Sequence, residues 1–454
     1  MENKINFNSK YNKEIIEKCI NLSFQTEEKR KKTSIKNKII NAKNSLKYNT
    51  FMIRYKFVWP KNGADVFLFH KKYINEAKFN EKLKKILLFT YRSYYKKQIS
   101  IKNKSSYISD CGWGCMIRSS QMIFARMIYK IFRYQFQKRM NADILIKSII
   151  PFFLDNNINL EEIPYNISDC FNIMIQNYVY QINLFLKEKT KDTNNNSKLK
   201  IQSIDPPFSI HKICMIGEIF GRTCGEWFSD YEIPKIYEII NSIFNILPEL
   251  SIIHFRSEID MKLIIEKCFE KEENNIIDDE IPEEEINYFI NEKKEKYVFK
   301  KIGGIFISVR LGVKEVPSEY YKSIKNLFKC KQFLGFIGGK NNSAAYYFGY
   351  SDDNLLYLDP HFNQESISNL DEKNLMTYIN KTVYNLSFSS MQCGFTIGFL
   401  IRNITDFEEL KIFFREYIKD KFPCFHVIFE NEKNKEILTP EEINKNINNN
   451  EDDF

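Results

Sequence analysis

The amino-acid sequence predicts an α+β fold in one large domain, and two observations lead to this prediction. In the first half of the chain, apolar residues recur at the three- and four-residue spacing of amphipathic helices. The second half contains short runs that are rich in β-branched and aromatic residues and are punctuated by glycine, as in consecutive strands. Helices first and a mostly antiparallel sheet afterwards are typical of the α+β class.

The helical spacing is clearest over 115–135, 141–154 and 232–248, and a further helix is expected over 406–420. The predicted strands share short length and β-branched or aromatic character. They are 302–313, 333–339, 344–350, 354–359, 393–402 and 424–430. The order of these elements places the last helix between the last two strands.

Composition indicates where this domain begins and ends. The chain has 454 residues, of which 43% are hydrophobic, enough for a substantial core and too many for a globally disordered chain. We expect a basic flexible tail over 1–50, a folded domain over 51–432 and a polar C-terminal tail over 433–454. Within the domain, a polar low-complexity loop is expected over 187–200 and an acidic insertion over 270–296.

The net charge of +9 is concentrated at the start of the chain, where residues 1–50 hold 12 basic and 5 acidic side chains. A nucleic-acid-binding domain usually carries its basic residues along a folded face, so no nucleic-acid partner is expected. No apolar run approaches the ~18 residues of a membrane-spanning helix, and the polar N-terminus has no secretory signal. We therefore expect a cytoplasmic protein.

The ten cysteines are scattered and include no CxxC pair. A structural zinc site needs four ligands, usually from two close pairs, so neither a metal nor another cofactor is expected. At about 2% of the chain, the cysteines are too few for a disulfide scaffold and are expected to be reduced thiols.

The segment Ser-Asp-Cys-Gly-Trp-Gly-Cys-Met-Ile-Arg, residues 109–118, leads directly into the first predicted helix. Two glycines allow a tight turn that ends with Cys115 in the first helical turn. Unpaired N–H groups and the positive end of the helix dipole favour a thiolate there. Because buried thiols are also common in ordinary cores, this pattern alone leaves a nucleophile and a packed cysteine both open.

A thiolate nucleophile needs a base, and His361 is the best placed of five histidines. It follows Asp359 and Pro360 at the end of a predicted strand, where residues two apart point to the same side. An acid beside an imidazole orients the ring, although Asp-Pro also commonly opens a turn. His211, close to Ser209, is the rival base, but it has the pattern of a histidine at a capped helix start.

Several such segments together resemble the autophagins, the cysteine proteases that process the ubiquitin-like modifier of autophagy. The resemblance runs from about residue 50 to residue 430. The matching segments occur in the family's order: Phe89-Thr90-Tyr91-Arg92, the segment 109–118 with Gln121-Met122, Phe208-Ser209-Ile210-His211, Gly225-Glu226-Trp227, Arg310-Leu311-Gly312, Gly338-Gly339-Lys340 and Tyr357-Leu358-Asp359-Pro360-His361.

The resemblance implies a papain-like cysteine protease fold with a small extra subdomain and inserted loops. It implies Cys115 as the nucleophile, His361 as the base and Asp359 as its orienting acid. It also implies that Tyr91 helps to hold the oxyanion and that Trp227 lies over the cleft and contacts the substrate. Without the family, both aromatic residues would be interpreted as ordinary core or surface side chains.

The implied activity is cleavage after the C-terminal glycine of a ubiquitin-like autophagy modifier, without metal or cofactor. The leaving group is either the tail of the precursor or phosphatidylethanolamine, which implies transient contact with a membrane surface. Two alternatives stay open: a deubiquitinase-like or amide-hydrolysing thiol enzyme on the same fold, and a catalytically dead protein that binds the modifier.

The chain departs from the family's pattern in three places. Cys111 precedes the Gly-Trp-Gly turn where other members carry other residues, and Asn341 stands where proline is usual. At the C-terminus, some relatives carry an acidic residue, an aromatic residue and then an aliphatic residue that bind the modifier. Here Phe454 is the last residue, so that motif is incomplete. The incomplete motif affects only docking of the modifier through this tail and leaves the catalytic assignment unchanged.

Overall fold

The structure is a computed structural model, and the account below is confined to the residues that it describes. These are residues 17, 43, 55–61, 65–97, 99–100, 106–136, 139–190, 203–271, 288–290, 296–339, 343–367, 369–380 and 382–429. The predicted C-terminal tail, 433–454, lies outside them, as does the predicted N-terminal tail apart from two residues. The domain boundaries therefore stay predictions.

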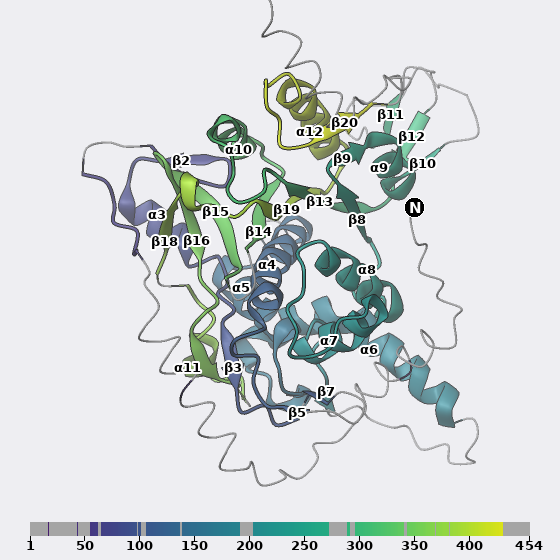
Figure 1. The fold of residues 1–454 in the computed structure, drawn as a ribbon. Coiled ribbons are helices and arrows are strands. Elements are labelled where there is room, and N and C mark those ends of the chain that lie inside the picture. Colours follow the sequence, from purple (N-terminus) through teal and green to yellow (C-terminus); the bar gives the residue numbers. More distant parts are fainter. Residues whose placement is uncertain are drawn as a thin grey trace, which may run out of the picture.

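One large mixed sheet forms the centre of the described fold (Figure 1). Its strands run in the spatial order β18 (Tyr384–Ser387), β16 (Asn354–Leu358), β15 (Ala345–Ser351), β14 (Phe333–Gly338), β19 (Gly394–Ile401), β13 (Ile302–Arg310), β8 (Leu250–Arg256), β9 (Glu258–Asp260) and β20 (His426–Ile428). β1 (Val66–Leu68) joins β15, and β2 (Lys71–Tyr73) pairs with β1. Only the pairs β13–β8 and β9–β20 are parallel among these strands, so the prediction of a mostly antiparallel sheet is confirmed.

Helices cover both faces of this sheet (Figure 1). On one face lie α4 (Cys115–Gln135), α5 (Ala142–Ile149), α6 (Tyr165–Thr190), α7 (Ile210–Gly217) and α8 (Glu232–Phe244). On the other lie α9 (Met261–Cys268), α10 (Tyr321–Leu327) and α12 (Ile404–Tyr417). The long helix α4 packs directly on β14 and β15, so its first residue is fixed against the sheet.

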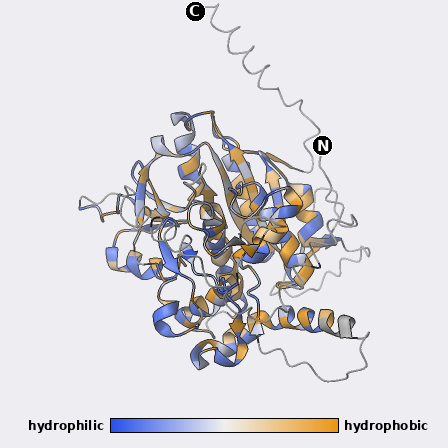
Figure 2. Ribbon diagram, turned by 60° about the horizontal axis from the view of Figure 1, so that its bottom comes forward, coloured by the Kyte–Doolittle hydropathy of each residue, from blue (hydrophilic) through white to orange (hydrophobic). Residues whose placement is uncertain are grey.

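Alternation along the strands divides the interior into two apolar cores. In β13, Phe306 packs with α4 and α8, whereas Ile305 and Ile307 point to the opposite core. This is the two-residue period expected of a strand that is buried on both faces. Figure 2 shows the hydrophobic residues gathered on the central strands and on the helices around them.

Shorter elements complete the described fold. Two more helices are α3 (Glu76–Leu83) and α11 (Glu372–Leu375). β3 (Tyr91–Ser93) pairs in parallel with β17 (Asn363–Glu365) and so connects two segments far apart in the chain. The remaining small sheets are β4 (Ile99–Ser100) with β5 (Ser106–Tyr107), β6 (Ile158–Asn159) with β7 (Ser203–Ile204), and β12 (Lys296–Phe299) between β10 (Phe269–Lys271) and β11 (Tyr288–Ile290).

The predicted elements are present, with three corrections. The segment 141–154 is not one helix, because α5 ends at Ile149 and a 3₁₀ turn over Ile150–Phe153 follows, with Pro151 near its start. The predicted start of the polar loop, residue 187, is too early, because α6 continues to Thr190. The acidic insertion 270–296 includes strands at its described edges.

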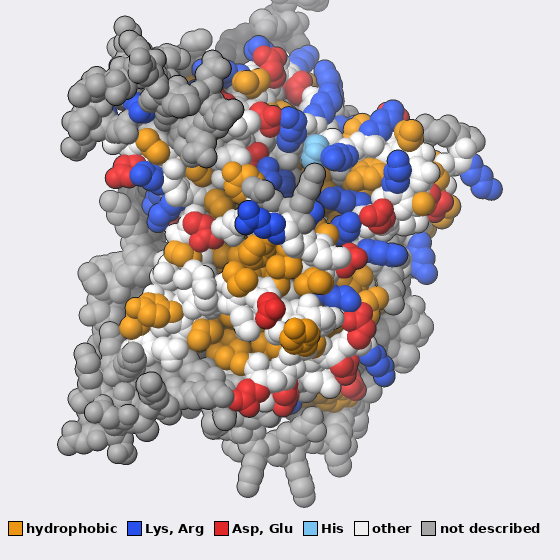
Figure 3. Space-filling model, turned by 180° about the vertical axis from the view of Figure 1, so that it is seen from behind, with side chains coloured by type: hydrophobic (Ala, Val, Ile, Leu, Met, Phe, Trp, Pro, Cys, Tyr) orange, Lys and Arg blue, Asp and Glu red, His pale blue; other side chains and the backbone are white. Residues whose placement is uncertain are grey.

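Figure 3 shows one face of the molecule, on which Lys and Arg side chains are numerous, most of them in its upper half. Among the described residues, no helix has both the length and the apolar character required to cross a bilayer.

Candidate active site

Cys115 is the first residue of α4 and directly follows a tight turn. Gly112 has φ +94°, in the left-handed region, and Gly114 is the N-cap residue without a side-chain cap. A Cβ on Gly114 would lie only 2.5 Å from a carboxylate oxygen of Asp110, so this close approach requires glycine. The backbone N–H groups of the first helical turn thus remain uncapped next to the thiol, which favours the thiolate.

His361 and Asp359 lie beside this thiol. All three residues are buried, with exposed fractions of 0% for Cys115 and 4% for each of the other two. The Nδ1 atom of His361 lies 2.5 Å from Oδ1 of Asp359, which also accepts the backbone N–H of His361 at 2.9 Å. His361 and Cys115 each shift the pKa of the other, so the imidazole and the thiol are neighbours. The carboxylate therefore fixes the orientation of the imidazole against the sulfur.

The end of β16 and its neighbours hold this arrangement. β16 ends at Leu358, Asp359 follows, and the carbonyl of Pro360 accepts the backbone N–H of Tyr91 at 3.0 Å. The parallel pairing of β17 with β3 continues from there. The segment that carries His361 is thus bound to the strand that carries Tyr91, so two distant parts of the chain meet at one sulfur.

Burial and hydrogen bonding oppose one another in setting the charges of this group. Burial raises the pKa of the Cys115 thiol, but the hydrogen bond and the positive charge of His361 more than offset it, so the pKa is lowered. Burial likewise lowers the pKa of His361, while hydrogen bonds to Asp359 and Cys115 raise it to about 9. Near neutral pH, the geometry therefore favours a thiolate–imidazolium pair.

Tyr91 is buried at the same place. Its ring meets the His361 ring edge-on, with the centroids 5.5 Å apart and the planes at 87°. Its side chain and the backbone of Ala344 also lower the pKa of the Cys115 thiol, so both lie near the sulfur. Ala344 was not predicted from the sequence, although the glycines before it, with Gly339 at φ +153°, signal a special turn.

The comparisons with known proteins agree with this geometry. A family model described as the peptidase C54 catalytic domain matches residues 76–412. The chain belongs to the peptidase C54 family. It is therefore a cysteine protease of autophagy, which processes and delipidates ubiquitin-like modifiers, and the resemblance to the autophagins is confirmed. Membership also implies a papain-like fold for this α+β chain.

Several curated cysteine proteases are similar to the chain over most of its length. ATG4D of Xenopus laevis is 24% identical over 402 residues, which cover 87% of this chain and 81% of the relative. ATG4C of Mus musculus is 21% identical, with coverage of 86% and 88%. ATG4 of Candida albicans is 28% identical over 332 residues, which cover 72% of this chain and 56% of the relative.

Trp227, the other aromatic residue expected at the C54 active site, is half-buried between α7 and α8. The start of its segment is fixed near the catalytic turn: a Cβ on Gly225 would collide with the Tyr107 ring, which packs edge-on against Trp113 at 5.7 Å. The Nε1 atom of Trp227 is buried and has no hydrogen-bond partner among the described residues. These contacts place the start of the segment near the turn before Cys115, and the Trp227 side chain packs against the core.

A buried carboxylate that the sequence reasoning missed supports the turn. Asp110 accepts hydrogen bonds from the backbone N–H of Arg92 and from the Tyr95 hydroxyl, each at 2.7 Å. Its second oxygen accepts Nε of Arg118 at 2.7 Å. Since Arg92 follows Tyr91 and Arg118 lies one helical turn after Cys115, one carboxylate holds the strand of the tyrosine against the helix of the cysteine.

Arg118 is fully buried, and its guanidinium forms hydrogen bonds and ion pairs with several buried polar side chains. Besides Asp110, it pairs with Asp155 through Nη1 at 3.0 Å, and it donates to Gln121 and to the Tyr95 hydroxyl, each at 3.0 Å. Arg118 was visible in the sequence as the arginine of the Cys-Met-Ile-Arg segment. Its two carboxylate partners could not be paired with it from the sequence, because Asp110 and Asp155 lie far from each other along the chain.

His211, the rival base, occupies a different place. Ser209 caps α7, as its position near the histidine predicted. Nε2 of His211 lies 2.9 Å from the Lys97 carbonyl oxygen and its ring packs on Tyr95, while burial lowers its pKa. The structure brings His361 to the thiol, and these contacts give His211 a structural role.

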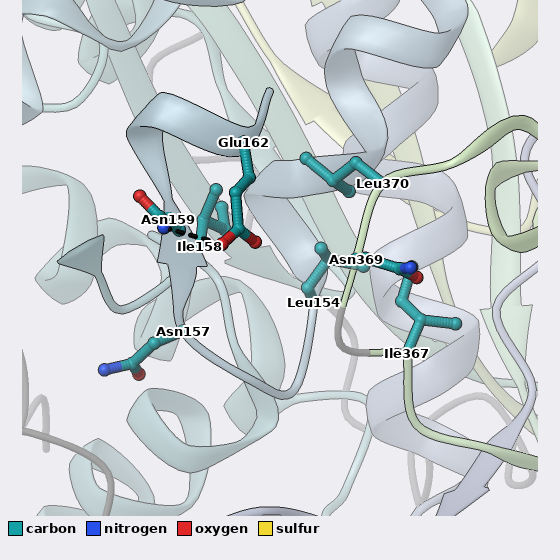
Figure 4. A pocket seen from close by; sticks show the side chains of 8 residues that line it. All are labelled: Leu154, Asn157, Ile158, Asn159, Glu162, Ile367, Asn369 and Leu370. Carbon is teal, nitrogen blue, oxygen red and sulfur yellow. Dashed lines mark hydrogen bonds between the residues drawn. The ribbon is translucent and has the colours of Figure 1, made fainter. Parts of the chain in front are cut away.

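Two depressions near these elements are small. One, of about 280 Å³, lies beside Asp359 and is lined by Leu88, Phe362, Met376, Thr377, Ile379, Thr382 and Tyr384. The other, of about 10 Å³, is shown in Figure 4 with its eight lining residues and holds no more than about one water. Among the described residues, no group of three or more His, Cys, Asp or Glu could hold a metal ion.

Proposed function

We propose that Cys115 is the nucleophile of this C54 protease, with His361 as general base and Asp359 as the group that orients it. The observation that carries the proposal is the buried hydrogen bond between the His361 imidazole and Asp359, beside a thiol at a helix N-terminus whose pKa His361 lowers. Tyr91 also lowers the pKa of this thiol, so its hydroxyl lies near an oxygen that forms next to the sulfur.

In the proposed reaction, the Cys115 thiolate attacks the carbonyl carbon of the scissile bond. The developing oxyanion receives hydrogen bonds from the Tyr91 hydroxyl and the Cys115 backbone N–H, a preorganised arrangement that typically contributes about 3–4 kcal/mol per donor. The His361 imidazolium protonates the leaving amine, and the neutral imidazole then activates a water molecule that hydrolyses the thioester.

The proposed substrate is a ubiquitin-like autophagy modifier with a glycine before the scissile bond, both as precursor and as phosphatidylethanolamine conjugate. Such a substrate presents an extended C-terminal tail, which a narrow cleft accepts only if no side chain precedes the scissile bond. We further propose a papain-like domain with a small extra subdomain, a cytoplasmic location and transient contact with membranes during release of the lipid conjugate.

Incubation with the purified precursor tests this function directly. We expect mass spectrometry to show a product that ends at the glycine, and vesicles that carry the lipidated modifier to release it. Ubiquitin with a C-terminal extension is the control for the deubiquitinase alternative. Cleavage of that control with an intact autophagy modifier would contradict the proposal.

The charges of the site lead to a prediction for the pH dependence of Cys115. Because its thiol pKa is lowered, alkylation by iodoacetamide should reach its plateau well below the ~8.5 of a free cysteine. Asp359→Asn removes the main partner that raises the pKa of His361, so the alkylation midpoint should move to higher pH. An identical profile in wild type and variant would contradict the ion pair.

The same pair affects stability in a defined pH range. The folded-state pKa of His361, about 9, lies above its ordinary value of 6.5. Protonated His361 therefore stabilises the fold fully below about pH 6.5, and this contribution is lost as the pH rises through about 9. Because the lowered pKa of Cys115 contributes in the opposite direction, urea unfolding between these pH values should show the loss in Cys115→Ser and a smaller one when Asp359→Asn is added.

A glycine requirement in the substrate is the next prediction. Replacing the glycine before the scissile bond by alanine should reduce cleavage sharply, and Trp227→Ala should relax this preference by opening the cleft. The measurement is the Gly/Ala rate ratio together with the melting temperature. Trp59→Ala, which removes a half-buried tryptophan packed on Phe79 at 5.3 Å, is the matched control. A lower melting temperature with an unchanged ratio in Trp227→Ala would mean that Trp227 is only a core residue.

A further inference from the structure

Arg126 is a buried cation in the middle of α4 that the proposed reaction does not use. Only 8% of its surface is exposed, and its guanidinium lies over the Phe69 ring at 4.3 Å and near the Tyr129 ring at 5.5 Å. Among the described residues, neither Nε nor Nη1 has a hydrogen-bond partner. A buried charge whose donors are unsatisfied costs several kcal/mol unless an anion completes it.

Other basic side chains from three elements lie within electrostatic reach of this guanidinium or of one another. α4 contributes Lys130 one turn further on and Arg133 two turns further on, and α3 contributes Lys82 in its last turn. The turn between β1 and β2 contributes His70, and the start of β2 contributes Lys71; Nδ1 of His70 is a third buried atom without a hydrogen-bond partner among the described residues. We call these six residues the Arg126 cluster.

Electrostatic repulsion within the Arg126 cluster is strong. Burial, followed by neighbouring cations of the cluster, lowers the pKa of His70 to about 4. The same two causes lower the pKa values of Lys82 and Lys130 to about 7 each. These groups therefore lie in an environment that disfavours further positive charge, which a bound anion would reverse.

The carboxylates within electrostatic reach are already paired. Glu81, near Tyr73, binds Lys85 at 3.3 Å. Asp406, near Lys130, makes two hydrogen bonds with the Arg402 guanidinium, at 2.6 and 3.0 Å. Arg133 and Lys130 each donate a hydrogen bond to a backbone carbonyl, at 2.7 and 3.1 Å. The N–H groups of Arg126, His70 and Lys82 are therefore the donors that we expect to bind a ligand.

We propose that the Arg126 cluster binds a phosphoryl group, either as inorganic phosphate or as the phosphate of a lipid headgroup. The planar fork of arginine matches two phosphate oxygens, and lysines at the rim add charge. Arg126 is eleven residues after Cys115, about 16 Å along the helix axis, so the cluster is separate from the reacting sulfur.

Thermal unfolding in phosphate and in chloride at equal ionic strength tests the proposal. Phosphate at about ten times its dissociation constant should raise the melting temperature of the wild type by about 2 °C or more. Arg126→Met should abolish this shift, and calorimetric titration should show phosphate binding at least about tenfold weaker. Arg256→Met is the matched control, because that guanidinium also lies over a tyrosine ring, Tyr231, at 4.1 Å, but outside the cluster.

Vesicles distinguish the two sources of the phosphoryl group. If it belongs to a lipid, the wild type should sediment with phosphatidylcholine vesicles that contain phosphatidic acid, Arg126→Met should not, and phosphate alone should give little stabilisation. Lys82→Met, at the rim, replaces Arg126→Met if that variant does not fold. The proposal is overturned if neither phosphate nor these vesicles bind the wild type more strongly than the variant.

Discussion

Replacing Cys115 by serine is expected to lower turnover of the modifier precursor by about a thousandfold or more. The site stabilises an anion on sulfur through His361, Tyr91 and Ala344, and an alcohol has a pKa too high to ionise there. Cys111→Ser is the matched control, because Cys111 is also buried and lies in the same turn. It should retain most of the activity.

The other two residues of the group should show a graded response. His361→Ala removes both base and acid and should be nearly inactive, whereas Asp359→Asn should fold and lose activity steeply through the wrong imidazole tautomer. His211→Ala should affect stability more than rate, since its ring contacts Tyr95 and the Lys97 carbonyl. An active Cys115→Ser variant, or an essential His211 with a dispensable His361, would contradict the assignment.

Arg118→Met is expected to lower the free energy of unfolding by about 3–5 kcal/mol, the usual cost of removing one partner of a buried ion pair. The substitution leaves the carboxylates of Asp110 and Asp155 buried without their cation. Urea denaturation at neutral pH measures the change. Adding Asp110→Asn to the variant should recover part of the loss, because one buried charge then disappears.

A matched control lies on the surface of the same chain. Arg222 pairs with Glu232 at 2.8 Å, but its side chain is 40% exposed. Arg222→Met should therefore cost no more than about 1 kcal/mol. Equal effects of the Arg118 and Arg222 substitutions would mean that the buried network contributes little to holding the turn that carries Cys115.

Local patterns in the sequence pointed to three residues that the structure brings together. The two glycines before Cys115 and the two-residue spacing of Asp359 and His361 are local features, and the structure places all three residues together. Ala344 and the partners of Arg118 could not be predicted this way. Most of these contacts depend on segments 23 to 229 residues away, which only the folded chain brings together.

The fold shows the same division between local and long-range information. The strands β13 to β16 and β19 were predicted because β-branched residues and glycine mark them, whereas the parallel strand β8 was missed. Its pairing partner, β13, begins about fifty residues later, and parallel pairing leaves no turn signal between them. The helix α6 was missed although Phe171, Ile175 and Tyr178 lie on its buried face at helical spacing.

Trapping the enzyme with a modifier that ends in an electrophile after its last glycine tests the central claim most directly. Peptide mapping of the adduct by mass spectrometry identifies the cysteine that is bound. The account predicts a single thioether to Cys115, absent from Cys115→Ser and retained in Cys111→Ser. An adduct on Cys111 or another cysteine, or one that still forms in Cys115→Ser, would contradict it.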